Sequence, residues 1–407
     1  MEPIFMPAHI LLPQVADMTK WSVVACDQYT SQPDYWERVE AFVGDAPSAL
    51  HMMLPEVYLE AEDVETRIAA IQTAMDAYLQ SGVLTACGQA YIYVERTLDN
   101  GRTRRGLVGA VDLEAYDYHA GSVSPVRATE GTILSRIPPR VRVRSGAKLE
   151  MPHIMLLIDD PSDTVIGPVA HQTGDFKRAY DFDLMEQGGH LSGWFVTGSA
   201  SSQVIKRLDS LVGQSPLAFA VGDGNHSLAT AKACYEQLKM ELGAQAAQNH
   251  PARWALCEVV NLHDASLEFE PIHRAVFGVD EAALLHALQT KLGLKEGRGP
   301  GQTVTVVTAD GETAYTIAEP CAKLSVGSVQ TVLDGYLKEN GGRVDYIHGA
   351  GTVRDLAKSG AVGLLLPAMD KAELFPSVLS DGALPRKTFS MGEANEKRFY
   401  LEARCIR

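Results

Sequence analysis

Residues 217–242 constrain the fold more than any other stretch of the chain. They read LAFAVGDGNHSLATAKACYEQLKMEL. Residues 217–221 form an apolar run with the length of a buried strand. After a glycine turn, apolar residues recur at helical spacing, at Leu228, Ala231, Tyr235, Leu238 and Leu242. The pattern predicts a strand, a turn and a helix over roughly 227–242.

The turn holds glycine and polar residues, in the order Gly222, Asp223, Gly224, Asn225, His226 and Ser227. Glycine and asparagine tolerate positive φ angles, and a helix N-terminus carries free N–H groups and a positive dipole end. We therefore expect the turn to bind an anion such as phosphate. The same residues also fit an ordinary helix start, in which Asn225 or Ser227 caps the helix and Asp223 holds the turn.

Composition restricts the partners of the chain. Its net charge of −15, from 36 basic and 51 acidic residues, opposes binding to nucleic acid or to an anionic membrane. Its six cysteines show no CxxC spacing, which argues against a zinc site or a disulfide framework. The N-terminus lacks the pattern of a signal peptide, and no apolar run has the length of a membrane span. We expect a cytoplasmic protein that acts on a small molecule.

The distribution of expected strands and helices predicts an α+β to α/β fold with mixed sheets. Residues 89–97 and 103–112 read as strands joined by the hairpin signal Asp99-Asn100-Gly101. After residue 303, expected strands and helices alternate, which is typical of α/β architecture. We expect a main α+β region over residues 1–300 and a smaller α/β region over 301–407.

The segment 127–150 is basic in an otherwise acidic chain. It holds six lysine and arginine residues against Glu130 and Glu150. Arg140, Arg142 and Arg144 alternate, so an extended backbone would place them on one face of a strand. We interpret them as a solvated strand face.

Four motifs together resemble a widespread bacterial family known as domain of unknown function 1015. The turn GDGNHSLATAKA resembles its ADGHHR-type motif, and RATE at 127–130, with Arg136, resembles its basic segment that contains a glutamate. PIHR at 271–274 is similar to its PTHR element, with Ile272 in place of threonine. LPRKT at 384–388 is similar to its C-terminal MPxKST element.

The resemblance implies a function as well as a family. The DGHHR-like turn of that family resembles the phosphate-handling motif of ParB and sulfiredoxin-like domains, some of which bind nucleotide, and some such small-molecule kinases phosphorylate free serine. There the turn holds phosphate, a glutamate acts as base and Mg²⁺ accompanies the nucleotide. This chain departs from the motif: Asn225 replaces the first histidine, His226 corresponds to the second and Ser227 replaces the arginine.

The implied roles fall into two groups. The predicted catalytic group has three members. Asp223 is the expected Mg²⁺ ligand, His226 is a hydrogen-bond donor to phosphate or a general acid, and Glu130 is the base. The predicted ligand-binding residues are Gly222, Gly224, Asn225, Ser227, Arg127, Thr129, Arg136, His273, Arg274, Arg386 and Lys387. We expect all of them around one cleft. Turn capping by Asp223 and ordinary ion pairs of Glu130 and Arg274 are the structural alternatives.

The leading interpretation is a nucleotide- and Mg²⁺-dependent small-molecule kinase, or a related phosphate-transfer enzyme, that acts on a small polar metabolite such as an amino acid. The alternative is a non-catalytic regulatory protein that binds a nucleotide or phosphate at the same turn. A third hypothesis, a ParB-like protein associated with DNA, is opposed by the charge of −15 and by the lack of a basic helix-turn-helix.

Overall fold

The computed structural model describes residues 3–119 and 121–407, which form two compact units. The first unit contains the chain up to Ala128, Thr132–Leu267 and Glu393–Arg407, and the second contains Thr129–Gly131 and Glu268–Gly392. The division predicted after residue 300 falls inside the second unit. Residues before that point belong there because β13 (Phe269–Phe277) pairs with strands that come later in the chain.

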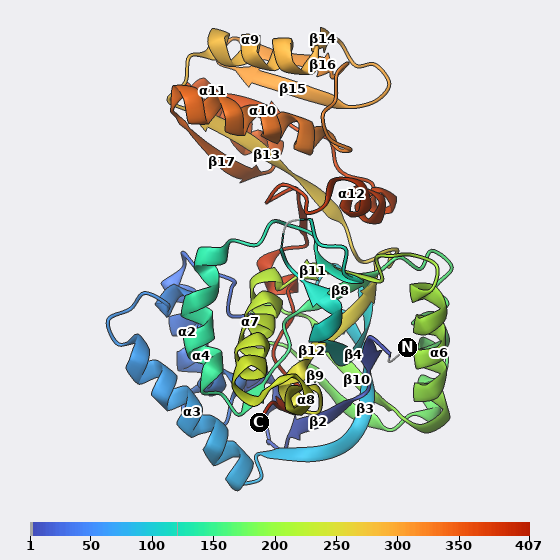
Figure 1. The fold of residues 1–407 in the computed structure, drawn as a ribbon. Helices are drawn as coiled ribbons and strands as arrows, with labels where there is room; N and C mark the ends of the chain where they lie inside the picture. The colour runs from blue at the N-terminus through green and yellow to red at the C-terminus, as the bar shows by residue number, and fades with distance from the viewer. Residues whose placement is uncertain (1–2, 120) are drawn as a thin grey trace. The chain divides into compact units, whose positions relative to one another are not determined.

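A large mixed sheet forms the framework of the first unit (Figure 1). Side by side, its strands are β5 (Tyr116–Asp117), β6 (Val126–Ala128), β11 (Phe219–Asp223), β8 (Met155–Ile158), β12 (Trp254–Asn261), β4 (Thr103–Asp112), β3 (Leu84–Thr97), β10 (His190–Val196) and β9 (Arg178–Asp183). Two more, β1 (Phe5–Met6) and β2 (Ala8–Pro13), pair with β4 and β3. The pairs β5–β6, β6–β11 and β8–β12 are parallel and the other pairs antiparallel. The expected mixed α/β fold and the hairpin between β3 and β4 are confirmed.

Both faces of this sheet are covered by hydrophobic cores. In β3, Ile92 and Val94 pack on one face, and Tyr91 and Tyr93 pack on the other, as the two-residue period of a strand requires. The helices of the unit are α1 (Met18–Trp21), α2 (Pro33–Val43), α3 (Val64–Gln80), α4 (Ile137–Ser145), α5 (Gly167–Ala170), α6 (Gly198–Val212), α7 (Asn225–Leu242) and α8 (Ala244–Gln248). Buried residues of α2 and α3 join the first core, and those of α6 and α7 join the second. None of the described helices is both long enough and apolar enough to cross a membrane.

The C-terminal segment 393–407 returns to the first unit and passes through its first core. Phe399, Tyr400 and Leu401 are buried there. Arg398 forms ion pairs with Glu258 and Glu402, which are also buried. Farther along, β20 (Arg404–Cys405) pairs with β7 (Leu149–Glu150). The returning segment is therefore a structural part of the first unit.

The second unit has an antiparallel sheet. Its strands lie in the order β14 (Lys295–Glu296), β16 (Gly311–Thr316), β15 (Thr303–Thr308), β18 (Val362–Leu365), β13 and β17 (Arg343–His348), and β19 (Phe389–Met391) also pairs with β13. Its helices are α9 (Glu281–Leu292), α10 (Ser325–Asn340), α11 (Ala350–Lys358) and α12 (Leu374–Asp381). The predicted alternation is present after residue 303, but β13 lies between β17 and β18, so each strand has antiparallel neighbours.

The arginine-rich segment is a helix, so the strand predicted for it is wrong. Helix α4 spans Ile137–Ser145 and has proline in its first turn, where the missing N–H costs no helical hydrogen bond. Its three arginines meet separate carboxylates instead of forming one solvated face: Arg140 pairs with Glu56, Arg142 with Glu65 and Arg144 with Glu150.

Candidate functional site

The predicted strand, turn and helix are present at the centre of the first unit. Strand β11 ends at Asp223, Gly224 adopts the left-handed conformation at φ 75°, and α7 begins at Asn225, two residues earlier than predicted. A side chain at Gly224 would also approach the backbone of Ile154 to 3.0 Å, so this position favours glycine. His226 and Ser227 therefore lie in the first turn of the helix.

No side chain caps the start of α7. The first helical hydrogen bond joins the N–H of Leu228 to the carbonyl of Gly224. The N–H groups of Asn225, His226 and Ser227 precede that bond, and an α-helix has no internal acceptor for them. These N–H groups allow the helix end to accept an anion. The buried Oδ1 of Asn225 also has no hydrogen-bond partner and, as an acceptor, it needs a donor group rather than an anion.

Asp223 and Lys397 meet beside the helix end. One carboxylate oxygen of Asp223 accepts the N–H of Gly224 at 2.9 Å, and the other lies 3.3 Å from Nζ of Lys397. Lys397 follows a short 3₁₀ helix, η8 (Ala394–Glu396), in the returning C-terminal segment. Asp223 thus holds the turn as the structural alternative proposed, and its carboxylate also lies beside Nζ of Lys397 at the uncapped start of α7.

Asp27 adds a second carboxylate to this cluster. Burial alone would raise the pKa of Asp27, but neighbouring His153, the amide of Gln28 and Lys397 together lower it below its ordinary value. The Gln28 amide donates to Asp27 at 2.9 Å. Asp27 is therefore ionised at neutral pH. Because its pKa is low, it can accept a proton only from a group that becomes more acidic during a reaction.

A chain of hydrogen bonds leads from the core to the first turn of α7. The N–H of Cys26 donates to Oη of Tyr400 at 3.2 Å, and Tyr400 Oη lies 2.8 Å from Nδ1 of His153. On the other side of the ring, Nε2 of His153 lies 2.7 Å from Oγ of Ser227. Ser227, which replaces the arginine of the family motif, is thus tied to a buried histidine.

His226 is neutral at physiological pH. Burial and the nearby positive charges of Arg140 and Arg136 lower its pKa to about 4, although Asp27 opposes the shift. Its Nε2 accepts the N–H of Ile133 at 3.3 Å, which leaves the proton on Nδ1. The ring can therefore donate one hydrogen bond to a ligand, but it does not bring a positive charge to one at pH 7.

Arg127 and Arg136 complete the set of predicted residues in the first unit. The Arg127 guanidinium donates to the carbonyls of Ser124, Val123 and Pro216, so it braces loops. Arg136 ends η4 (Leu134–Arg136), just before α4, and its charge is felt at His226. Of these two arginines, Arg136 is the one whose charge is coupled to the turn.

The other predicted residues form a second cluster, within the second unit. A carboxylate oxygen of Glu130 accepts the N–H of Lys387 at 3.0 Å, and Glu130 forms a β-bridge with Leu384 next to Thr129. Arg274 is fully buried and donates to Gln330 and to the carbonyls of Ile272, Lys387 and Arg386.

His273 is also buried in the second unit, where its Nδ1 accepts the N–H of Leu366 at 3.2 Å. The guanidinium of Arg386 lies over the ring of Tyr346, as that of Arg274 does. Thr129 and Glu130 of the RATE motif thus lie with the PIHR and LPRKT motifs in the second unit. A single cleft that also includes Asp223 and His226 stays a prediction.

Four residues near the start of α7 carry little signal in the sequence: Asp27, His153, Lys397 and Tyr400. A polar segment after an apolar run, DQYTSQPDYW, marks Asp27 only weakly.

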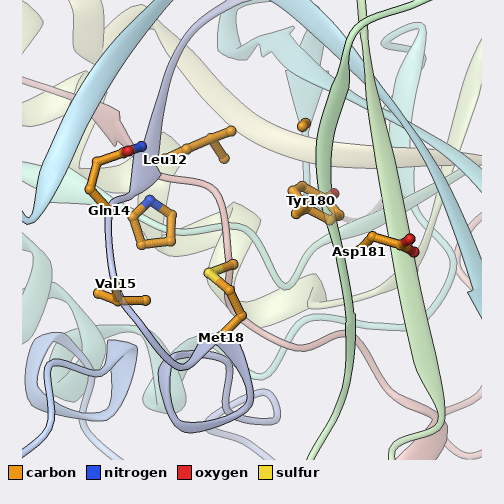
Figure 2. A pocket seen from close by; sticks show the side chains of 8 residues that line it. Leu12, Gln14, Val15, Met18, Tyr180 and Asp181 are labelled. Carbon is orange, nitrogen blue, oxygen red and sulfur yellow. The ribbon is translucent and has the colours of Figure 1, made fainter.

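A cavity of the first unit, of about 410 Å³, is lined by none of these four residues and lies between the end of β2 and β9. Figure 2 shows Leu12, Val15 and Met18 of its wall opposite Tyr180 and Asp181.

Comparison with known proteins gives one family and several loosely similar structures. No curated protein matches the chain. Solved structures with a similar fold include a free serine kinase in complex with AMP (13% identity, TM-score 0.38, covering 70% of this chain and 90% of that one). A C-terminally truncated SbnI from Staphylococcus aureus (14%, 0.39, 70% and 82%) and a conserved hypothetical protein from Pyrococcus furiosus (11%, 0.37, 72% and 93%) are two others.

Backbone similarity at TM-scores below 0.5 is too loose to assign a function. The family match is extensive. The family model described as "Protein of unknown function (DUF1015)" matches residues 7–336, and the chain therefore belongs to this family, as its motifs predicted.

Proposed function

We propose that the first unit binds the phosphates of a nucleotide at the start of α7 and transfers a phosphoryl group to a hydroxyl group of a small polar metabolite, such as an amino acid. The observation that carries the proposal is the uncapped helix end at Gly224, with Lys397 and the ionised Asp27 close by. Helix N–H groups and a lysine offset phosphate charge, and a carboxylate supplies the base.

The proposed step needs few groups. Asp27 takes the proton of the substrate hydroxyl, whose oxygen forms a bond to the terminal phosphorus of the nucleotide. The bond between that phosphorus and its bridging oxygen breaks, and the leaving nucleoside diphosphate keeps the electron pair. Lys397 and the N–H groups of α7 offset the charge that spreads over the phosphoryl oxygens. Glu130, the base predicted from the motif, belongs to the second unit and has no role in this step.

Phosphoryl transfer from a nucleotide ordinarily requires Mg²⁺, which neutralises phosphate charge. Asp223 would hold it, because carboxylate oxygens are the ligands that Mg²⁺ prefers. The Asp223 carboxylate also lies 3.3 Å from Nζ of Lys397, so Mg²⁺ would compete with this lysine for the carboxylate.

One feature favours the alternative of a regulatory protein that binds without catalysis. Two cations near the turn already have partners: Arg140 is paired with Glu56, and Lys397 with Asp223. In a regulatory protein of this kind, the helix end would hold a nucleotide or phosphate. No phosphoryl transfer would follow, so Asp27 would not act as a base.

The test measures binding and turnover separately. Melting temperatures with ATP, ADP and pyrophosphate, with and without Mg²⁺, report binding, because a ligand of the folded state raises stability. Release of ADP with serine and other hydroxyl-bearing amino acids reports transfer. We expect ligand-induced stabilisation together with transfer that the Asp27→Asn variant abolishes. Binding without turnover would support the regulatory alternative, and the absence of any ligand-induced shift would refute both.

A further inference from the structure

A second cavity of the first unit has a volume of about 620 Å³, and some residues of its wall are close in sequence to residues of the proposed phosphate site. Its wall includes Tyr29, Gln32, Tyr35, Arg38, Gln187 and Asn395. Tyr29 comes two residues after Asp27, and Asn395 comes two residues before Lys397. Two residues span at most about 7 Å of backbone, so two separate chain segments connect this cavity closely to the proposed site.

Strained backbone is concentrated at this cavity. Five of the described non-glycine residues have positive φ angles, and three of them line the cavity: Tyr29 at 53°, Glu186 at 49° and Gln187 at 60°. Such conformations are rare for residues with side chains and persist where surrounding contacts impose them. Here the carbonyl of Gln187 accepts the amide of Asn395 at 3.0 Å, which ties one wall of the cavity to the other.

Arg96 holds these walls together from inside. Its buried guanidinium donates to the carbonyl of Gly188 on one side, and to those of Asn395 and Lys397 on the other. The cavity wall and the lysine of the phosphate site thus share one buried cation. A ligand that touches both regions would meet a rigid surface, because moving either segment would remove part of the acceptors of the buried Arg96 guanidinium.

The wall offers stacked aromatic rings. The rings of Tyr29 and Tyr35 are parallel, 3.7 Å apart at 10°, and Trp36 packs edge-on against Tyr35 at 5.3 Å. Tyr35 is only 3% exposed, and its buried hydroxyl group has no hydrogen-bond partner. Burial raises the pKa of Tyr35, so this hydroxyl keeps its proton and remains a donor in need of an acceptor.

The polar groups at the rim suit the edge of a heterocycle. The side-chain amides of Gln32 and Gln187 each provide both a donor and an acceptor. Arg38 lies over the ring of Tyr35 at 5.6 Å and pairs with Glu186 at 3.1 Å. Stacking rings together with amide groups are the means by which proteins bind bases outside a duplex.

We propose that this cavity binds the heterocyclic base of the nucleotide whose phosphates reach the start of α7. The inference rests on the proposed function and adds the position of the base. Tyr29 is the stacking residue, and Gln32 and Gln187 contact the edge of the base. The proposal also explains why three strained residues surround a cavity so close to Asp27 and Lys397.

The test compares ligands that carry the base, the phosphates or both. In the wild type, we expect ADP to bind at least about 10-fold more tightly than pyrophosphate, and adenosine to bind detectably, as measured by calorimetry. The Tyr29→Leu variant should weaken ADP by roughly 10-fold or more, in line with the stacking contribution of a base. Its affinity for pyrophosphate should stay unchanged. Tyr58→Leu, which removes another partly buried tyrosine of the first unit, is the control.

The outcomes separate the two proposals. Two results would overturn the base site and leave the proposed function standing. One is an unchanged affinity of the Tyr29→Leu variant for ADP, and the other is equal affinities of the wild type for ADP and pyrophosphate. Failure of all three ligands to bind the wild type would overturn both. If Tyr29→Leu folds poorly, Gln32→Leu replaces it, because Gln32 is exposed and its loss should also weaken ADP and adenosine but not pyrophosphate.

Discussion

Family motifs occur in both units, but their polar groups are used differently. At the start of α7, three N–H groups lack helical acceptors and Oδ1 of Asn225 has no partner. In the second unit, Arg274 directs its guanidinium at Gln330 and at three backbone carbonyls. A motif residue with satisfied, buried groups stabilises the protein, whereas unsatisfied groups at a helix end are available to a ligand.

The largest effect should follow from the Asp27→Asn substitution, which keeps the shape of the side chain but removes the proposed base. We expect phosphoryl transfer to fall by roughly 10²- to 10⁴-fold, with nucleotide binding retained. Steady-state rates and ligand-induced melting shifts measure the two properties. Asp159→Asn is the control, because Asp159 also contacts a histidine, His263, at 2.7 Å. Equal losses in both variants would remove Asp27 from the chemistry.

Arg274→Ala should affect stability but not ligand binding. Burial lowers the pKa of Arg274 to about 10, so it is charged at pH 7, and its removal leaves several buried acceptors unpaired. We expect a loss of about 3 kcal/mol in unfolding free energy, measured by urea denaturation. Arg386→Ala is the matched control in the same unit, since Arg386 is exposed, and should cost under about 1 kcal/mol. If the Arg274→Ala protein were as stable as the wild type but had lost nucleotide binding, Arg274 would be a binding residue instead of a structural one.

Lys397→Met should weaken phosphate binding by roughly 10- to 100-fold, because a charged hydrogen bond contributes about 1.5–3 kcal/mol. Titration with pyrophosphate measures this directly. Lys232→Met removes a lysine of the same unit with nearly equal burial, 15% exposed against 16%, and should leave the affinity unchanged. Similar affinities for Lys397→Met and the wild type would show that the helix end alone, or another cation, holds the phosphate.

The smallest effect concerns pH. The pKa of His226 is about 4 in the folded protein and about 6.5 when unfolded, so the unfolded chain binds the proton more tightly. Its contribution to stability is complete above pH 6.5 and is lost as the pH falls towards 4. His226→Gln should therefore flatten the decrease in melting temperature between pH 7 and 5. His190, whose pKa is raised by Asp183 and Asp181, should show the opposite sign on substitution.

Local patterns in the sequence predicted local structure well. The apolar run before Gly222 and the helical stripe after Ser227 identified β11 and α7, because both signals lie within a few residues of each other. The arginine segment misled for the same reason. Alternation at Arg140, Arg142 and Arg144 imitates a strand, and the carboxylates that favour α4, such as Glu56, are far away in sequence.

The candidate site was predictable only where it is local. Asp223 and His226 belong to one motif and could be found, whereas Asp27, His153 and Lys397 are brought together by folding. Lys397 has no distinguishing neighbours in the sequence, and its position depends on the returning segment. No pattern of spacing could have linked it to Asp223.

That returning segment also orders events during synthesis. The N–H of Cys26 bonds to Tyr400, 374 positions later, and buried Glu258 awaits its partner Arg398. Until the ribosome has made Arg398 and Tyr400, the first unit has a gap in its core and an unpaired carboxylate beside it. The proposed site, which needs Lys397, therefore becomes competent only after these residues have been translated. A shorter nascent chain could not hold a nucleotide at the site.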